Sequence, residues 1–251
     1  MVSAIGEDKF LLLAPTGNAA CGIGGTTIHR GLELPVGRRG SSGDLSSRSL
    51  AALQARLSGV DFILVDEVSM VGKNVLGLMD RRGRQARPAE AEALDETFAG
   101  LNVIFVGDPA QLPPVGEAPM WSDSSAGQHS AAGAMCWAEL NSCVELTEVM
   151  RQTGEAQAAF RETLLAIAES NAQLRHWEQL QPRVRDNLSA AEIKRFDTAV
   201  HLFPTNEAAR VWNTRRLQEL ETPIARIDAE HTIADDANGS PDRFRGLVPH
   251  L

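Results

Sequence analysis

The 251-residue sequence has few of the features that mark secreted, membrane or disulfide-bonded proteins. Its three cysteines, Cys21, Cys136 and Cys143, form no CxxC pair, and their odd number argues against a disulfide framework. No apolar run approaches the roughly 20 residues that a membrane helix needs. The first nine residues include acids and few apolar side chains, which does not suit a secretion signal. We therefore expect no membrane partner and a place in the cytosol or nucleus.

Basic residues are also scarce, because 24 lysines and arginines stand against 33 acids and give a formal net charge of −9. Such a balance does not favour nucleic-acid binding, since contact with phosphate selects a basic surface. A motor protein can nevertheless carry a basic channel on an acidic body. The net charge alone therefore does not exclude a nucleic-acid partner.

What the sequence does contain is a series of short apolar runs that alternate with helical patterns. The expected strands are 10–14, 61–65, 101–106, 144–146 and 199–203. The expected helices are a short one capped by Asn18, then 50–57, 73–85, a largely helical region at 156–195, and 207–221. Nearly continuous apolar strands that alternate with helices indicate an α/β protein with a parallel sheet covered on both faces.

Two adjacent carboxylates follow the expected strand at 61–65. Ligands of open α/β sheets lie beyond the carboxyl ends of the strands, so Asp66 and Glu67 are placed to act on one. In nucleotide hydrolases the first such acid holds Mg²⁺, and the second orients or activates the attacking water. For the pair taken alone, a simple role in capping the next helix is an open alternative.

A second motif at 107–115 follows the strand at 101–106 and has the sequence GDPAQLPPV. Gly107–Asp108 gives a sharp exit from the strand, and Gln111 is a neutral donor that can hydrogen-bond a γ-phosphate or the attacking water. Pro113–Pro114 stiffens the segment beyond it. Two strands with these endings predict a nucleotide-hydrolysing motor.

Six segments in the correct order resemble the motifs of superfamily-one 5′→3′ DNA helicases, in particular the petite-integration-frequency helicase family with its Helitron-type relatives. These segments are 14–20, 24–29, 65–70, 107–115, 146–152 and 202–206. The resemblance covers most of the chain, from about Leu11 to Leu220. It implies a RecA-like P-loop NTPase motor domain at 1–143, with a flexible insertion at about 37–49, followed by part of a second RecA-like domain at 144–251.

The resemblance implies that the complete protein couples ATP hydrolysis to 5′→3′ translocation on single-stranded DNA and to unwinding at duplex junctions. Asp66 would coordinate Mg²⁺, Glu67 would activate water and Gln111 would sense the γ-phosphate of ATP. Arg151 would approach that phosphate as an arginine finger, a contact worth roughly 10³–10⁵ in rate. DNA repair, recombination or telomere maintenance would be its task, in the nucleus or another intracellular compartment that contains DNA.

The same resemblance places Thr16, Asn18 and His29 against single-stranded DNA. Short polar side chains and backbone N–H groups at a loop-to-helix junction suit contact with phosphate. Three plainer alternatives stay open: Asn18 only caps its helix, His29 is a packed core residue, and Arg151 is a surface arginine at the end of a strand.

One motif of such helicases is missing from the sequence. A phosphate-cradling GxxxxGK[ST] loop is needed, but Gly17–Gly22, which has the glycine spacing, is followed by Ile23–Gly24 in place of Lys–Ser/Thr. The late motifs of the second motor domain are not found either. We expect a fragment of a helicase; the alternative is a degenerate homologue that binds DNA or a partner without hydrolysing ATP.

Overall fold

The computed structural model of the chain describes residues 6–35, 44–89, 95–124, 127–223 and 225. The chain divides into two compact units, 1–176 and 177–251, and each is described by itself. The domain boundary expected at 143/144 stays a prediction. Most of the expected insertion and the tail at 228–251 lie outside the described residues, but Ser47–Ser49 are helical rather than part of a flexible segment.

Four parallel strands form the sheet of the first unit, in the order β2-β1-β3-β4. The strands are β1 (Phe10–Ala14), β2 (Thr26–Thr27), β3 (Phe62–Val65) and β4 (Asn102–Phe105). The sequence predicted β1 with its exact bounds, and β3 and β4 within one residue at each end. The parallel sheet with its flanking helices confirms the predicted α/β class.

The register of the three long strands sorts their side chains onto two unequal faces. Ile63 lies level with Leu11 and Val103, while Val65 lies level with Leu13 and Phe105. All six side chains belong to or pack against the hydrophobic core. On the opposite face, the level of Leu12, Leu64 and Ile104 is only half-buried. Within the described residues, the expected cover on both faces is therefore complete on one face only.

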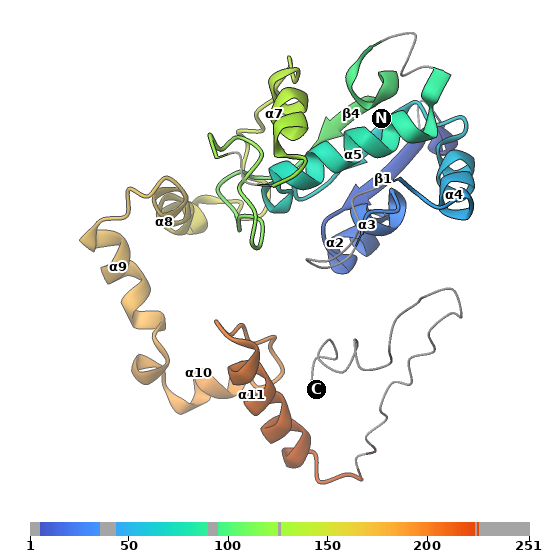
Figure 1. Cartoon of the computed structure of the whole chain (residues 1–251). Helices are drawn as coiled ribbons and strands as arrows, with labels where there is room; N and C mark the ends of the chain where they lie inside the picture. The colour runs from blue at the N-terminus through green and yellow to red at the C-terminus, as the bar shows by residue number, and fades with distance from the viewer. Residues whose placement is uncertain (1–5, 36–43, 90–94, 125–126, 224, 226–251) are drawn as a thin grey trace. The chain divides into compact units, whose positions relative to one another are not determined.

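Helices of the first unit connect the strands and supply most of the core. They are α2 (Gly17–Gly22), α3 (Ile28–Gly31), α4 (Ser47–Leu57), α5 (Lys73–Ala86), α7 (Ser130–Ala138) and α8 (Ala158–Ala168). Figure 1 shows α5 running alongside the sheet with α7 beside it, and α2 and α3 near one end of β1. Leu53 and Leu57 of α4 and Leu76 and Met79 of α5 fill the buried face.

Short 3₁₀ turns and further helices complete the described chain. The turns are η1 (Glu7–Lys9), η2 (Val68–Met70), η3 (Thr97–Gly100), η4 (Glu155–Gln157), η5 (Gln181–Arg183) and η6 (Arg185–Asn187). The helices are α9 (Leu174–Leu180), α10 (Ala190–Arg195) and α11 (Asn206–Glu219). They bear out the helical patterns expected at 156–195 and 207–221. No helix within the described ranges has the length and apolar character to span a bilayer.

Two expected strands, 144–146 and 199–203, are wrong. Val144, Leu146, Val200 and Leu202 are apolar, yet each exposes 86% or more of its surface. A strand is stable only when a neighbour satisfies its backbone hydrogen bonds, and no other described segment pairs with either one. An apolar run alone therefore did not make a strand here.

Helices α5 and α7 approach each other closely through two glycines. A Cβ on Gly77 would collide with the backbone oxygen of His129, and one on Gly133 would collide with the backbone oxygen of Lys73. Both clashes are with backbone, which cannot rotate away as a side chain can. The crossing therefore requires a residue without a side chain on each helix.

We predict that Gly77→Ala and Gly133→Ala each destabilise the protein by about 2 kcal/mol. Overpacking of this kind costs roughly 1–3 kcal/mol, which outweighs the gain in helix propensity of up to about 1 kcal/mol. Urea unfolding followed by far-UV circular dichroism measures the change. Gly22→Ala is the control, because a Cβ there meets nothing within 4 Å. An unchanged midpoint for both crossing variants would contradict the close approach.

Cys136 of α7 is the one buried cysteine among the described residues. Burial, with smaller contributions from the carboxylates of Asp80 and Glu139, raises the pKa of its thiol from 9.0 to about 12. The unfolded chain therefore loses this proton at lower pH than the folded chain does. The stability linked to the thiol is complete below pH 9 and is lost as the pH rises from about 9 to about 12.

We predict that the free energy of unfolding falls above pH 9, by at most about 1.4 kcal/mol per pH unit from this one thiol. The sequence has no tyrosine and only three lysines, so few other groups titrate in that range. Cys136→Ala should flatten the fall, whatever it does to the stability at pH 7. Urea unfolding at pH 8, 9, 10 and 10.5 measures both slopes, and equal slopes would count against the shift.

Candidate functional site

The carboxyl ends of three strands meet at one edge of the sheet. The amide of Asp66 donates to the backbone oxygen of Leu13 on β1, at 2.9 Å. The amide of Val106 donates to Val65 at 2.8 Å, and the amide of Val68 donates back to Val106 at 3.0 Å. These bonds hold the loops after β1, β3 and β4 side by side, and all the predicted site residues up to Gln111 lie on these loops or on the helices α2 and α3 that follow β1 and β2.

Asp66 lies half-buried immediately after β3. Its Oδ1 atom accepts a hydrogen bond from the amide of Glu67 at 2.9 Å, which fixes the carboxylate at the edge. No described residue donates to Oδ2. A free carboxylate oxygen suits Mg²⁺, which takes oxygen ligands and usually keeps waters and substrate phosphates around it. No cluster of three or more His, Cys, Asp or Glu within the described residues could hold a metal by protein ligands alone.

Glu67 has a left-handed backbone, with φ 55° and ψ 51°. Such a conformation is uncommon for residues other than glycine and costs of order 1–3 kcal/mol. The carboxylate caps nothing: η2 has no side-chain cap, and α5 starts after Gly72. The alternative that Asp66 and Glu67 only cap the next helix is therefore wrong. The strained backbone instead leaves the Glu67 carboxylate without a structural role in the described part of the chain.

The loop after β4 is held against the loop after β3. Gly107 has φ 144°, and a Cβ there would lie 2.7 Å from the amide nitrogen of Val68. Asp108 then closes a turn, accepting from the amide of Ala110 at 2.9 Å through its side chain and from the amide of Gln111 at 3.0 Å through its backbone. The side chain of Gln111 is exposed at the tip. Gln111 is thus presented to solvent beside the two carboxylates.

The segment beyond this loop is anchored to the start of α5, which the sequence analysis missed. Glu117 accepts from the amides of Asn74 and Val75 at 3.2 and 3.3 Å. The amide of Lys73 donates to Ala118 at 3.0 Å. A sequence signal existed: Gly72, the residue before α5, has no side chain to cap a helix, so an acceptor from elsewhere in the chain was required.

Lys73 strengthens the same anchor from the interior. Its side chain is buried, yet its ammonium donates to the backbone oxygen of Ser124 at 3.0 Å and to that of Ser122. A buried ammonium needs such acceptors, because an unpaired charge in the interior is costly. The loop that carries Gln111 is therefore fixed at both ends, at Gly107 and at Glu117.

The three predicted DNA contacts lie toward the other end of the same edge. Thr16, not Asn18, caps α2, since its hydroxyl accepts from the amide of Ala19 at 3.3 Å. The capping role for Asn18 is therefore wrong, and its side chain is exposed. His29 lies on α3 and is half-buried, so it is not a fully packed core residue. Pairing of β2 with β1 places the starts of α2 and α3 together. Contact with DNA stays a prediction for all three.

Arg151 lies in an irregular segment and its guanidinium is exposed. It makes no hydrogen bond or ion pair with the described residues. The residues just after it are held by Arg161, which donates to the backbone oxygens of Gln152 at 2.6 Å and Gly154 at 2.7 Å. The strand whose end it was expected to occupy does not form. The structure does not bring Arg151 to Asp66, and the arginine-finger role stays a prediction.

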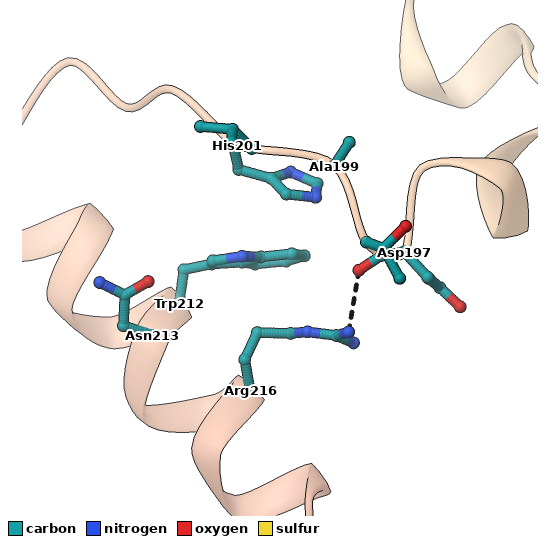
Figure 2. A pocket seen from close by; sticks show the side chains of 8 residues that line it. Asp197, Ala199, His201, Trp212, Asn213 and Arg216 are labelled. Atoms are coloured by element: carbon teal, nitrogen blue, oxygen red, sulfur yellow. Dashed lines mark hydrogen bonds between the residues drawn. The ribbon is translucent and has the colours of Figure 1, made fainter.

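A cavity of about 470 Å³ lies in the second unit, between α11 and the segment before it. Figure 2 shows the ring of Trp212 between His201 on one side and Arg216 on the other. The centroids of His201 and Trp212 are 4.4 Å apart, and Arg216 donates to the backbone oxygen of Asp197 at 2.9 Å. None of the predicted site residues lines this cavity. We interpret it as the aromatic packing cluster of this unit.

The chain is similar to a set of related proteins. A family model described as PIF1-like helicase matches residues 2–181. The ATP-dependent DNA helicase PIF1 of Xenopus laevis is 28% identical over 220 residues, which are 88% of this chain and 32% of the relative. The ATP-dependent DNA helicase Pif1 of Bdellovibrio bacteriovorus is 28% identical over 217 residues, 84% of this chain and 44% of the relative. The chain thus spans less than half the length of these relatives.

Solved structures show the same similarity. The crystal structure of a Pif1 helicase from Bacteroides in complex with ADP-AlF3 and single-stranded DNA matches with a TM-score of 0.64 at 26% identity. The match covers 86% of this chain and 48% of that one. A Pif1 helicase from Candida albicans also gives a TM-score of 0.64, at 22% identity, which supports the fold alone.

We predict that Glu117→Ala destabilises the start of α5 by about 1 kcal/mol, because loss of a capping acceptor typically costs 0.5–2 kcal/mol. Native-state hydrogen exchange of the Asn74 and Val75 amides measures the change, which should be an acceleration of roughly fivefold for 1 kcal/mol. Glu148→Ala is the control, because Glu148 is exposed and bonds to no described residue. Equal exchange in both variants would show that the anchor carries no load.

Proposed function

The chain belongs to the family of PIF1-like helicases, and from this premise we propose that it is the part of an ATP-dependent 5′→3′ DNA helicase that activates water for ATP hydrolysis. Its proposed partners are single-stranded DNA and duplex junctions, in DNA repair, recombination or telomere maintenance, in the nucleus or another compartment with DNA. The supporting observation is the hydrogen-bonded edge that holds Asp66, Glu67 and the loop of Gln111 together.

The proposed chemistry divides among these residues. Asp66, with one oxygen fixed by the Glu67 amide, holds Mg²⁺ through the other; the ion supplies neutralisation of the β- and γ-phosphate charge when it is bound. Glu67, whose carboxylate has no structural partner among the described residues, orients the attacking water and accepts its proton. Gln111 donates a hydrogen bond toward the γ-phosphate. Arg151 stabilises the same phosphate from a separate segment.

Single-stranded DNA is proposed to contact the far end of this edge. Thr16, Asn18 and His29 lie where β2 pairs with β1, two strands away from the loop of Gln111 in the sheet order. Half-exposed polar side chains and the amides of two short helices suit phosphate contact there. Nucleotide and DNA would then bind to loops of one sheet, which gives hydrolysis a short path to DNA affinity.

The alternative, a homologue that binds DNA or a partner without hydrolysing ATP, rests on one observation. The sequence has no GxxxxGK[ST] motif, and Gly17–Gly22 forms helix α2 rather than an open loop around phosphate. Coding sequence adjoining Met1 discriminates the two. An in-frame GxxxxGK[ST] motif there favours the helicase, whereas a promoter and stop codon directly upstream favour the alternative.

We predict that the 251-residue chain hydrolyses ATP very poorly, because no lysine and no backbone cradle hold the phosphates. A protein extended by the in-frame motif should show ATPase activity that single-stranded DNA stimulates. Glu67→Gln in that protein should lower kcat by at least 100-fold while ATP binding changes less than threefold, since the amide keeps the shape of the carboxylate but cannot accept a proton.

The matched control is Glu148→Gln, the same change at an exposed position outside the proposed site. Unwinding of duplexes with 5′ or 3′ single-stranded tails tests the direction, and only the 5′-tailed duplex should be opened. Robust DNA-stimulated ATPase in the 251-residue chain, abolished by Glu67→Gln, would overturn the requirement for a phosphate loop. An extended protein unaffected by Glu67→Gln would overturn the assignment of the base.

A further inference from the structure

A second cavity lies on the first unit, away from the residues assigned above. It has a volume of about 430 Å³ and is formed by α5, the start of α7 and Asp44. Its polar lining includes Arg81, Arg84, Gln85 and His129. Neither the carboxylates after β3 nor the loop after β4 contributes to it. The cavity is therefore a feature that the proposed function does not use.

His129 is the most informative of these residues. It exposes only 8% of its surface, and its Nε2 atom makes no hydrogen bond with any described residue. The backbone is fixed, since its amide donates to Oδ1 of Asn74 at 2.8 Å and its carbonyl accepts from the amide of Gly133 at 3.0 Å. A buried polar atom without a partner is costly, so a rigidly held one that lines a cavity indicates a ligand atom.

Arg81 supplies a second group of the same kind. Its Nη2 atom donates to Oδ1 of Asp44 at 2.9 Å, but its Nε atom is buried and has no partner among the described residues. Arg81 and His129 thus line one cavity, and each brings a nitrogen that is not satisfied. The guanidinium presents its N–H groups as a fork that matches the oxygens of carboxylate and phosphate groups.

The charges around the cavity favour an oxyanion over a cation. Burial first, and then the positive charges of Arg81 and Arg82, lower the pKa of His129, so the local potential at the imidazole is positive. The carboxylate of Asp80 is already saturated, by two bonds from Arg84 at 3.0 and 3.1 Å and one from the amide of Phe98 at 2.7 Å. It therefore adds no free acceptor for a cation.

The structure contains an example of the chemistry that the cavity attracts. Oδ1 of Asp44, which lies on a largely exposed side chain, accepts from Arg81 and, at 2.7 Å, from Gln85. One oxygen of a carboxylate is thus already bound at the rim by two donors of α5. The unsatisfied nitrogens of Arg81 and His129 remain for a second oxyanion.

We propose that this cavity is a binding site for a phosphate group, with the guanidinium of Arg81 and the imidazole of His129 as its donors. The phosphate belongs either to a free anion or nucleotide or to the backbone of bound DNA. The site is independent of ATP hydrolysis at Asp66 and Glu67, so failure of either assignment leaves the other intact.

Nuclear magnetic resonance of the 251-residue chain tests the proposal with inorganic phosphate as the probe. The six histidines give few ring signals, and His129→Gln identifies that of residue 129 by its loss. At constant pH and ionic strength, phosphate replacing chloride should shift the His129 signal saturably. Arg81→Gln should weaken the apparent affinity at least tenfold. Arg215→Gln on α11, which removes the same charge in the other unit, should leave it unchanged.

Arg81→Lys keeps the positive charge and serves if Arg81→Gln does not fold; it should weaken binding by a similar factor, because one ammonium cannot replace the fork. A His129 shift that does not saturate, or equal weakening by Arg81→Gln and Arg215→Gln, would overturn the site. A thymidine oligonucleotide added to the phosphate-bound protein then identifies the source. Displacement of phosphate assigns the site to the DNA backbone, and persistence assigns it to free phosphate or nucleotide.

Discussion

The hydrogen-bonded alignment of β1, β3 and β4 is the constraint on which the rest of the structure depends. Because the three strands are parallel and in register, every loop that leaves their carboxyl ends begins at the same edge. A shift of β3 by one residue would turn Ile63 and Val65 out of the core, so burial of these side chains fixes the alignment. The chemistry of Asp66 and Glu67 is thus positioned by apolar residues that take no part in it.

Helix α5 carries this alignment away from the sheet. Glu117 and Lys73 fix its first turn to the segment that follows Gln111, and the glycines at 77 and 133 fix its middle to α7. Because the carbonyl of Gly133's neighbour turn, at His129, lies directly over Gly77, the same crossing also buries the imidazole beside Arg81. One helix therefore connects the candidate hydrolytic edge and the proposed phosphate cavity.

The sequence predicted the parts of this protein that depend on local pattern. The bounds of β1, the class of the sheet and the position of Asp66 and Glu67 after β3 all follow from apolar runs and the residues that end them. Contacts between distant segments were not predictable in this way: Glu117 caps a helix more than 40 residues earlier, and the pair of nitrogens from Arg81 and His129 comes together only through packing. Apolar patterns at 144–146 and 199–203 failed because a strand also needs a partner.

The left-handed backbone of Glu67 has a consequence for how this chain can change over many generations. At such a position glycine or asparagine would relieve the strain, so selection for folding alone drives residue 67 away from glutamate. A lineage that had long ceased to need a base here would be expected to lose it early, and with a gain in stability. The glutamate still present at this point is therefore a clock, and it indicates that selection for hydrolysis acted on the ancestors of this chain until recently.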